Sequence, residues 1–136
     1  MASKLNPYLG FRGNCREAMT FYASVFGGSP EFMTFGDMGE TGDTKDQVMH
    51  SSLVTDAGYT LFGSDTPPGM ELRGNGQISV SGDDTDQLRG YWDRLSDGAN
   101  VEVPLERQPW GDDYGHLVDK FDILWMVNIA GEGNQA

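Results

Sequence analysis

The chain has 136 residues and carries 9 basic against 21 acidic side chains, for a formal net charge of −12. This length fits one domain that buries a core without disulfides or a structural metal, and the acidic excess argues against nucleic acids and anionic membranes as partners. No signal-peptide pattern and no run of about 18 apolar residues is present, so we expect a cytoplasmic protein.

A short strand at residues 7–11 and a helix that begins after Asn14 are the first predicted elements. Asn14 is a favourable N-cap residue, and Glu17 stands three positions later, as a capping box requires. Apolar residues then recur at helical spacing as far as Phe26, and two glycines end the helix. Cys15 is the single cysteine; the helix dipole could activate its thiol, but no partner base is visible nearby.

Three extended segments follow, at residues 31–35, 47–55 and 59–63. The first two are separated by a polar, glycine-rich loop over residues 36–46, which we interpret as a mobile flap, with simple disorder as the alternative. A linker rich in proline and glycine then occupies residues 65–75, and such a stretch is typical of a boundary between two folded segments.

The second half repeats this order. A helix begins at Asp84 with Gln87 in the reciprocal capping position, and Gly98 ends it. Asp84 follows Asn14 by 70 residues, and each helix carries an adjacent pair of aromatic residues. The predicted strands of this half are residues 77–81, 101–103, 107–118 and 123–129.

Each half therefore reads strand, helix and three strands, and such a repeat predicts the architecture directly. We predict an α+β fold of two βαβββ modules within one domain over residues 1–136. Module one covers about residues 4–64, the linker residues 65–75, and module two about residues 76–131.

Two βαβββ modules in one short chain resemble the vicinal oxygen chelate superfamily, which includes glyoxalase I, extradiol dioxygenases and bleomycin resistance proteins. The segments YLGF at 8–11, FYASVFGG at 21–28, WGDDYG at 110–115 and DKFD at 119–122 are similar to its PhnB-like branch, often called 3-demethylubiquinone 3-methyltransferase-like. The resemblance covers about residues 7–129. It implies a glyoxalase-like fold with curved mixed sheets, helices outside, a cleft inside, and a homodimer.

Enzymes of this superfamily hold a divalent metal with four inward-facing residues from the opening and closing strands of the modules. Counting along the strands places these positions at Pro7, Phe62, Gln77 and Met126. Only Gln77 offers a donor that a hard or borderline cation accepts, since proline and phenylalanine have none and a thioether suits soft metals. A shift of one residue gives no better set, so we predict neither the usual metal site nor a cofactor.

The cleft that the resemblance implies is apolar and aromatic with a few polar groups, which is typical of a small-molecule site. The candidate ligand-binding residues are His50, Phe62, Gln77, Trp110, Tyr114, Trp125 and Met126. Any of them could equally pack in the core. PhnB-like proteins often carry a histidine at the position of His50, which is a candidate general base, ligand contact or structural residue.

The remaining ionisable residues near the end of the chain are open to two interpretations. Asp112, Asp113 and Asp119 are candidate catalytic acids, but aspartate in loops more commonly caps turns. His116 is interpreted as a strand-surface residue, and the spacing does not support a metal shared by His116 and His50. No catalytic residue can be assigned from these patterns.

We therefore expect a PhnB-like protein that binds a small, partly aromatic or amphipathic molecule without a metal. Three alternatives stay open. The first is a metal-dependent lyase, isomerase or dioxygenase of the same superfamily, and the second is a drug-sequestering protein of the bleomycin-resistance kind, since the acidic charge suits a cationic antibiotic. The third is a scaffold without a ligand.

Overall fold

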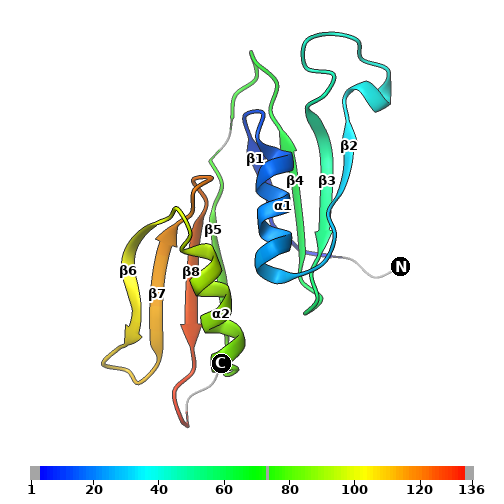
Figure 1. Cartoon of the computed structure of the whole chain (residues 1–136). Helices are drawn as coiled ribbons and strands as arrows, with labels where there is room; N and C mark the ends of the chain where they lie inside the picture. Colours follow the sequence, from blue (N-terminus) through cyan, green and yellow to red (C-terminus); the bar gives the residue numbers. More distant parts are fainter. Residues whose placement is uncertain (1–3, 73, 134–136) are drawn as a thin grey trace. The chain divides into compact units, whose positions relative to one another are not determined.

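The computed structural model describes residues 4–72 and 74–133. The chain divides into two compact units after Asn75, and each unit is a four-stranded mixed sheet with an α-helix (Figure 1). This arrangement confirms the predicted α+β fold of two βαβββ modules. The grouping of both modules into a single domain stays a prediction.

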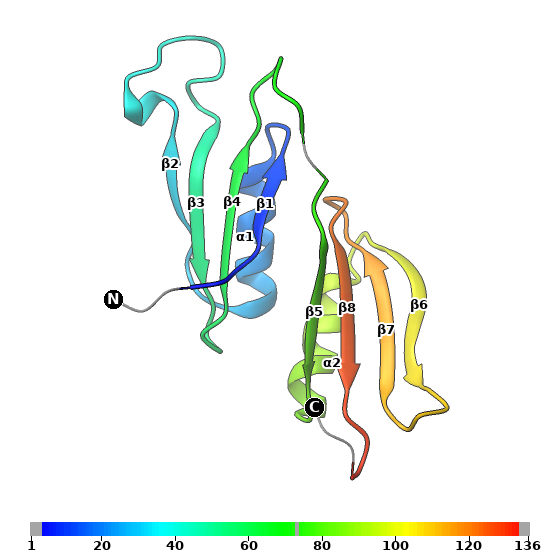
Figure 2. The same cartoon turned by 180° about the vertical axis from the view of Figure 1, so that it is seen from behind.

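The first unit has the sheet order β1-β4-β3-β2, in which β1 runs parallel to β4 and the other pairs are antiparallel (Figure 2). Its elements are β1 (Tyr8–Phe11), α1 (Cys15–Phe26), β2 (Glu31–Thr34), the short 3-10 helix η1 (Gly36–Met38), β3 (Val48–Val54) and β4 (Thr60–Asp65). Alternate strand residues face α1 because side chains along a strand point to opposite sides. Leu9, Phe11, Leu53 and Leu61 are buried in this way, as are Met19 and Tyr22 of α1.

The second unit repeats the pattern with the order β5-β8-β7-β6, and β5 runs parallel to β8. Its elements are β5 (Gln77–Gly82), α2 (Thr85–Leu95), β6 (Asn100–Arg107), β7 (Asp113–Val118) and β8 (Leu124–Ile129). The predicted strand over 107–118 is wrong at its start. Residues 108–112 form a tight turn instead, closed by bonds from Gln108 N to Asp112 O (2.8 Å) and from Gly111 N to Gln108 O (2.9 Å).

The two helices begin in different ways. Asp84 caps α2 as predicted, since its side chain accepts a hydrogen bond from Gln87 N at 3.1 Å. Asn14 makes no side-chain cap, which contradicts the expected capping box at α1. Asp65, at the end of β4, replaces it: one carboxylate oxygen accepts from Cys15 N and the other from Val48 N, each at 2.9 Å.

The ends of the helices also differ from one another. α1 ends at Gly27, whose φ of 85° favours glycine. α2 ends at Leu95, so Gly98 lies beyond the helix rather than ending it. In residues 4–72 and 74–133, neither helix reaches the length and apolar character needed to cross a membrane.

The loop over residues 36–46 is hydrogen-bonded at its base. Phe35 N donates to Gln47 O at 3.1 Å, and Gly36 N donates to Lys45 O at 2.7 Å. The side chains of Thr34 and Asp37 each accept from the other residue's backbone N–H. These contacts continue the β2–β3 pairing into the loop, and its role as a mobile flap stays a prediction.

Replacement of Asp65 by alanine is expected to lower the free energy of unfolding by about 2–5 kcal/mol, because it leaves two buried N–H groups without an acceptor. Urea unfolding followed by circular dichroism measures this loss. Asp84→Ala is the matched control, since an exposed cap contributes only about 1 kcal/mol. Equal losses in the two variants would contradict the central role of Asp65.

Candidate functional site

Each sheet has one face that its own helix covers and one face that this helix leaves uncovered, which we call the open face. In β1 and β4, Leu9 and Leu61 face the helix and are buried, whereas Tyr8 and Phe62 alternate with them and lie on the open face. The same alternation places His50 on the open face. The open faces therefore carry strand side chains that do not pack against the helix of their own module.

The open face of the first module carries three aromatic rings in contact, Tyr8, His50 and Phe62, which we call the first cluster. The hydroxyl of Tyr8 lies 3.0 Å from His50 Nδ1. The ring of Phe62 meets the other two edge to face, at centroid distances of 5.8 Å to Tyr8 and 5.0 Å to His50. Tyr8 is directly opposite Phe62 in the parallel β1–β4 pair, so the backbone register brings the rings together.

The first cluster is open to contact from outside its module. Tyr8 is 54% exposed, and His50 and Phe62 are partly exposed. Nδ1 of His50 is engaged with Tyr8, and its second ring nitrogen has no hydrogen-bond partner within the described part of the chain. This nitrogen can therefore donate to or accept from a molecule that lies over the rings.

The open face of the second module carries another tyrosine–histidine pair, here with a carboxylate. We call Glu102, Trp110, Tyr114 and His116 the second cluster. The Tyr114 hydroxyl lies 3.1 Å from His116 Nδ1, and His116 Nε2 lies 3.3 Å from Glu102 Oε1. The Trp110 ring is 6.3 Å from the Tyr114 ring, and Met126 is opposite His116 across the β7–β8 pair.

Six of the seven predicted ligand-binding residues fall into three groups in the structure. His50 and Phe62 meet in the first cluster, while Trp110 and Tyr114 meet in the second, with Met126 beside it. Gln77 is exposed at the start of β5, outside both clusters.

Trp125 does not line an open face, so its assignment to the ligand site is wrong. The side chain is only 1% exposed, and its Nε1–H donates to Asp119 Oδ2 at 2.8 Å. Strand alternation explains the error, because Trp125 shares the helix-facing side of β8 with Val127 and Ile129. It is a core residue.

The metal positions counted from the sequence are offset by one residue between the opening strands. The last residues of β1 and β5, Phe11 and Gly82, lie 71 positions apart rather than 70, because the loop from β1 to α1 is one residue longer than the loop from β5 to α2. Pro7 therefore corresponds to Ile78, and Gln77 corresponds to Asn6.

The donors at these positions do not fit a divalent metal. Asn6 and Gln77 are neutral amides, and the closing strands still supply only Phe62 and Met126. Such a site needs imidazole or carboxylate ligands. Across residues 4–72 and 74–133, no three or more His, Cys, Asp and Glu side chains come together as a metal-binding group.

The aspartates of the WGDDYG and DKFD segments are structural. Asp112 accepts from Asn128 Nδ2 (3.0 Å) and from Gly131 N (2.9 Å), which ties the end of β8 to the turn before β7. Asp119 accepts from the backbone N–H groups of Phe121 and Ile123 in addition to Trp125. Asp119 thus caps its own turn, the commoner of the two expected roles, whereas Asp112 makes a long-range contact that fastens β8.

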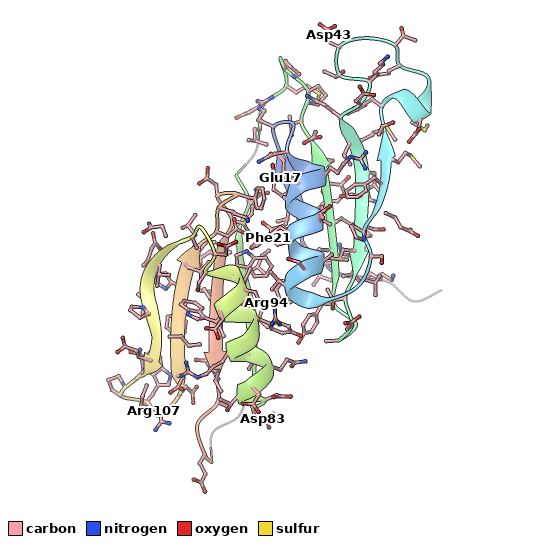
Figure 3. The ribbon with its side chains drawn as sticks, in the orientation of Figure 1. Glu17, Phe21, Asp43, Asp83, Arg94 and Arg107 are labelled. Carbon is pink, nitrogen blue, oxygen red and sulfur yellow. The ribbon has the colours of Figure 1, made fainter. Side chains whose placement is uncertain are left out.

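Asp113 joins two arginines at one edge of the second module. Its oxygens accept from Arg89 Nη2 at 2.8 Å and from Arg107 Nε at 3.0 Å. Figure 3 shows Arg107, which lies at the end of β6. Hydrogen bonds from Arg107 and then Arg89 hold the pKa of Asp113 below its ordinary value.

Gly115 accounts for another part of the WGDDYG segment. A Cβ at this position would lie 2.8 Å from the backbone of Leu105 and 2.8 Å from the ring of Trp92. Any larger residue would push β6 or α2 away from β7. Packing and turn geometry therefore restrict which residues this segment can contain. Of its six residues, only Trp110 and Tyr114 belong to the second cluster.

Tyr8 and Glu102 are cluster residues that the sequence patterns did not indicate. Period-two alternation could have placed Tyr8, because it is one residue from the buried Leu9. Glu102 lies at an irregularity in the β6–β7 pairing, between Val101 and Val103. A β-bulge of this kind changes the face of a residue and has no signal in the sequence here.

Comparison with known proteins agrees with the superfamily resemblance of the sequence. The family model of the glyoxalase/bleomycin resistance protein/dioxygenase superfamily matches residues 4–127. The crystal structure of protein PA1353 from Pseudomonas aeruginosa is 35% identical, with a TM-score of 0.82, over 94% of this chain and 98% of that one.

Two further proteins are more distant. The putative 3-demethylubiquinone-9 3-methyltransferase, PhnB protein, from Bacillus cereus is 20% identical with a TM-score of 0.73, over 94% of this chain and 100% of that one. Protein YjdN from Escherichia coli (strain K12) is 24% identical over 93% of this chain and 95% of its own length. The PhnB likeness shows the fold.

Cys15 is expected to resist thiol reagents in the folded protein. Its side chain is fully buried, and burial raises the pKa of the thiol to about 11, which excludes the activated cysteine considered from the sequence. At about pH 8, roughly one thiol in a thousand is then ionised. A disulfide-exchange reagent should label Cys15 quickly in denaturing urea and at least about a hundredfold more slowly without it; similar rates would contradict the burial.

Asp113 is expected to contribute to stability above its ordinary pKa of about 3.9 and to lose that contribution as the pH falls through its lower folded value. Asp113→Asn should therefore destabilise the second module at about pH 6 and much less at about pH 2. All three tryptophans lie in this module, so urea unfolding followed by tryptophan fluorescence measures it. Asp93→Asn, an exposed change on α2, is the control and should show no comparable pH dependence.

Proposed function

Because the chain belongs to the glyoxalase/bleomycin resistance protein/dioxygenase superfamily, we propose that it binds a small, partly aromatic molecule without a metal ion. The observation that carries this proposal is the first cluster. Tyr8, His50 and Phe62 form a partly exposed aromatic surface with one hydrogen-bonding nitrogen at its centre.

The composition of the first cluster suits an uncharged or weakly polar ring. Edge-to-face aromatic contacts contribute about 0.5–1.5 kcal/mol beyond the area they bury, so a flat ligand on Phe62 gains binding energy without a charge partner. His50 adds direction, because a single polar atom in an apolar surface orients a ligand more than it strengthens binding. Neither contribution requires a metal, in keeping with the poor donor set at the superfamily's metal positions.

A drug-sequestering role is the second candidate. The net charge of −12 favours it, because an acidic surface attracts a cationic antibiotic from a distance. It differs from the first proposal in its salt dependence: binding by general charge weakens as salt is added, whereas binding by ring contacts does not.

We also propose that the protein acts as a homodimer in the cytoplasm. Met33 and Val54 are large apolar residues that stay substantially exposed on the open face of the first sheet. Such exposure favours a second copy of the chain that covers this face. Sedimentation analysis at micromolar concentration measures the assembly, and a monomer at that concentration would contradict this part of the proposal.

His50→Ala and Phe62→Ala are each expected to weaken binding of a neutral aromatic probe, 2-naphthol, by about fivefold or more. The physical reason is the loss of one ring contact or one hydrogen bond, each worth about 1 kcal/mol. Calorimetry measures the change. Tyr59→Ala is the matched control, because it removes an exposed ring of the same module that packs on Phe26, outside the cluster.

Three results would count against the proposal. The first is an equal loss of naphthol binding in Tyr59→Ala, and the second is no binding by the unaltered protein. The third is stoichiometric zinc, iron or manganese in gently purified protein, measured by elemental analysis, which would favour the metal-dependent alternative. A strong salt dependence would favour the drug-sequestering role.

A further inference from the structure

We propose that Tyr114 is a proton-transfer residue on the open face of the second module, and that His116 and Glu102 position and activate it. The inference goes beyond ligand binding at the first cluster and does not depend on it, because all of its residues belong to the second module.

The contacts favour one direction of proton transfer. Glu102 Oε1 lies 3.3 Å from His116 Nε2, which is ion-pair distance, and because a carboxylate only accepts, it favours the tautomer with the proton on Nε2. Nδ1 of the neutral imidazole then has a lone pair and accepts the phenol proton of Tyr114 at 3.1 Å. The phenol oxygen consequently directs its proton toward the imidazole and keeps its own lone pairs for a substrate.

The order of hydroxyl, imidazole and carboxylate in Tyr114, His116 and Glu102 is that of an activated hydroxyl. A base within hydrogen-bond reach of the hydroxyl, itself oriented by a third group, is the arrangement that lets a hydroxyl take up a proton near neutral pH. His116 is 28% exposed and Glu102 is 44% exposed at their side chains. The relay is therefore accessible rather than a buried structural network.

The first module offers an internal comparison. Tyr8 and His50 make the same oxygen–nitrogen contact at 3.0 Å. Among the residues that the structure describes, however, no carboxylate is within ion-pair distance of His50, so nothing fixes its tautomer. The relay is complete only in the second module, where the irregularity in β6 brings Glu102 to His116.

The simplest reaction for this relay is removal of a proton from carbon next to a carbonyl group. The C–H proton moves to the phenol oxygen of Tyr114 while the phenol proton moves to His116 Nδ1. The electron pair of the C–H bond becomes the C=C bond of an enolate, and the carbonyl oxygen takes the negative charge. The imidazolium formed is stabilised by Glu102, and return of the proton reverses each transfer, so no oxidant, reductant or cofactor is consumed.

The surroundings indicate the class of substrate. Trp110 is 58% exposed, and its ring lies beside that of Tyr114, which gives a flat apolar surface next to the phenol oxygen. Met126, opposite His116, is apolar as well. The acidic charge of the chain disfavours an anion. An uncharged aryl ketone or other conjugated carbonyl compound fits these conditions.

The test follows deuterium exchange into the methyl group of acetophenone in D₂O by proton NMR. The unaltered protein should exceed the buffer rate by about tenfold or more, since general acid–base groups contribute about 10²–10⁴ with a fitted substrate and less with a simple probe. Tyr114→Phe should return the rate to that of buffer. Tyr59→Phe, which alters an exposed tyrosine of the other module, should leave the rate unchanged.

Glu102→Gln separates positioning from a purely structural role. Gln can donate to Nε2, so the imidazole no longer has a single favoured tautomer, and exchange should fall about tenfold while the protein stays folded. Nitrogen NMR of the imidazole should show the Nε2–H form of His116 in the unaltered protein and a mixture in this variant. Exchange at the buffer rate in the unaltered protein, or undiminished exchange in Tyr114→Phe, would overturn the proposal, and naphthol binding to the first cluster would be unaffected by either result.

Discussion

The parallel pairing of the opening strand with the closing strand is the constraint on which each module depends. β1 pairs with β4, and β5 pairs with β8, so the first and last segments of each module lie side by side in its sheet. A parallel pair cannot be joined by a tight turn and needs a crossover of about a dozen residues or more. In each module this crossover contains the helix and the two remaining strands, which gives the βαβββ order.

The same pairing lets a residue at the end of the closing strand accept a hydrogen bond from the start of the helix. In the first module the closing strand ends at Asp65, whose carboxylate accepts from the first N–H of α1 and from β3. In the second module the cap comes from Asp84 within the chain segment itself. The modules thus satisfy unpaired N–H groups in the first turn of the helix by a long-range contact at Cys15 in one case and a local contact at Gln87 in the other.

The sequence was sufficient to predict the features that depend on residues close together in the chain. The capping residue of α2, the apolar periodicity of both helices and the order of strands all depend on residues within about one turn or one strand of each other, and these predictions were confirmed. The Asp65 cap was not predictable in the same way, because it joins residues 50 positions apart along the chain.

The candidate site was predicted less completely, for two physical reasons. Strand faces alternate with a period of two, so one extra residue in the loop before α1 was enough to shift the count of metal positions, and Trp125 was placed on the wrong face. Glu102 depends on an irregularity in β6 that no residue type marks. His50 and Tyr114, which a resemblance and an aromatic pattern indicated, and Phe62, which was counted from the turn at Gly58, do lie on the open faces, and their role in ligand binding stays a prediction.

The WGDDYG segment illustrates how a recognisable sequence divides into structural and chemical roles. Gly115 is required by the contact of β7 with Trp92 and Leu105, and Asp112 and Asp113 hold the turn and an arginine pair. Family likeness in such a segment is therefore explained by packing and does not by itself indicate an activity.

The chemical roles fall to the side chains on the open faces, where the two modules differ. Both present a tyrosine hydroxyl to the Nδ1 of a histidine, but only the second adds a carboxylate at Nε2. A neutral tyrosine–histidine pair is a hydrogen-bonding surface, whereas the same pair with a fixed tautomer directs a proton along one path. In our proposal, one fold repeated within a chain separates binding from proton transfer through a single side chain, Glu102, and neither proposed role calls for a divalent metal.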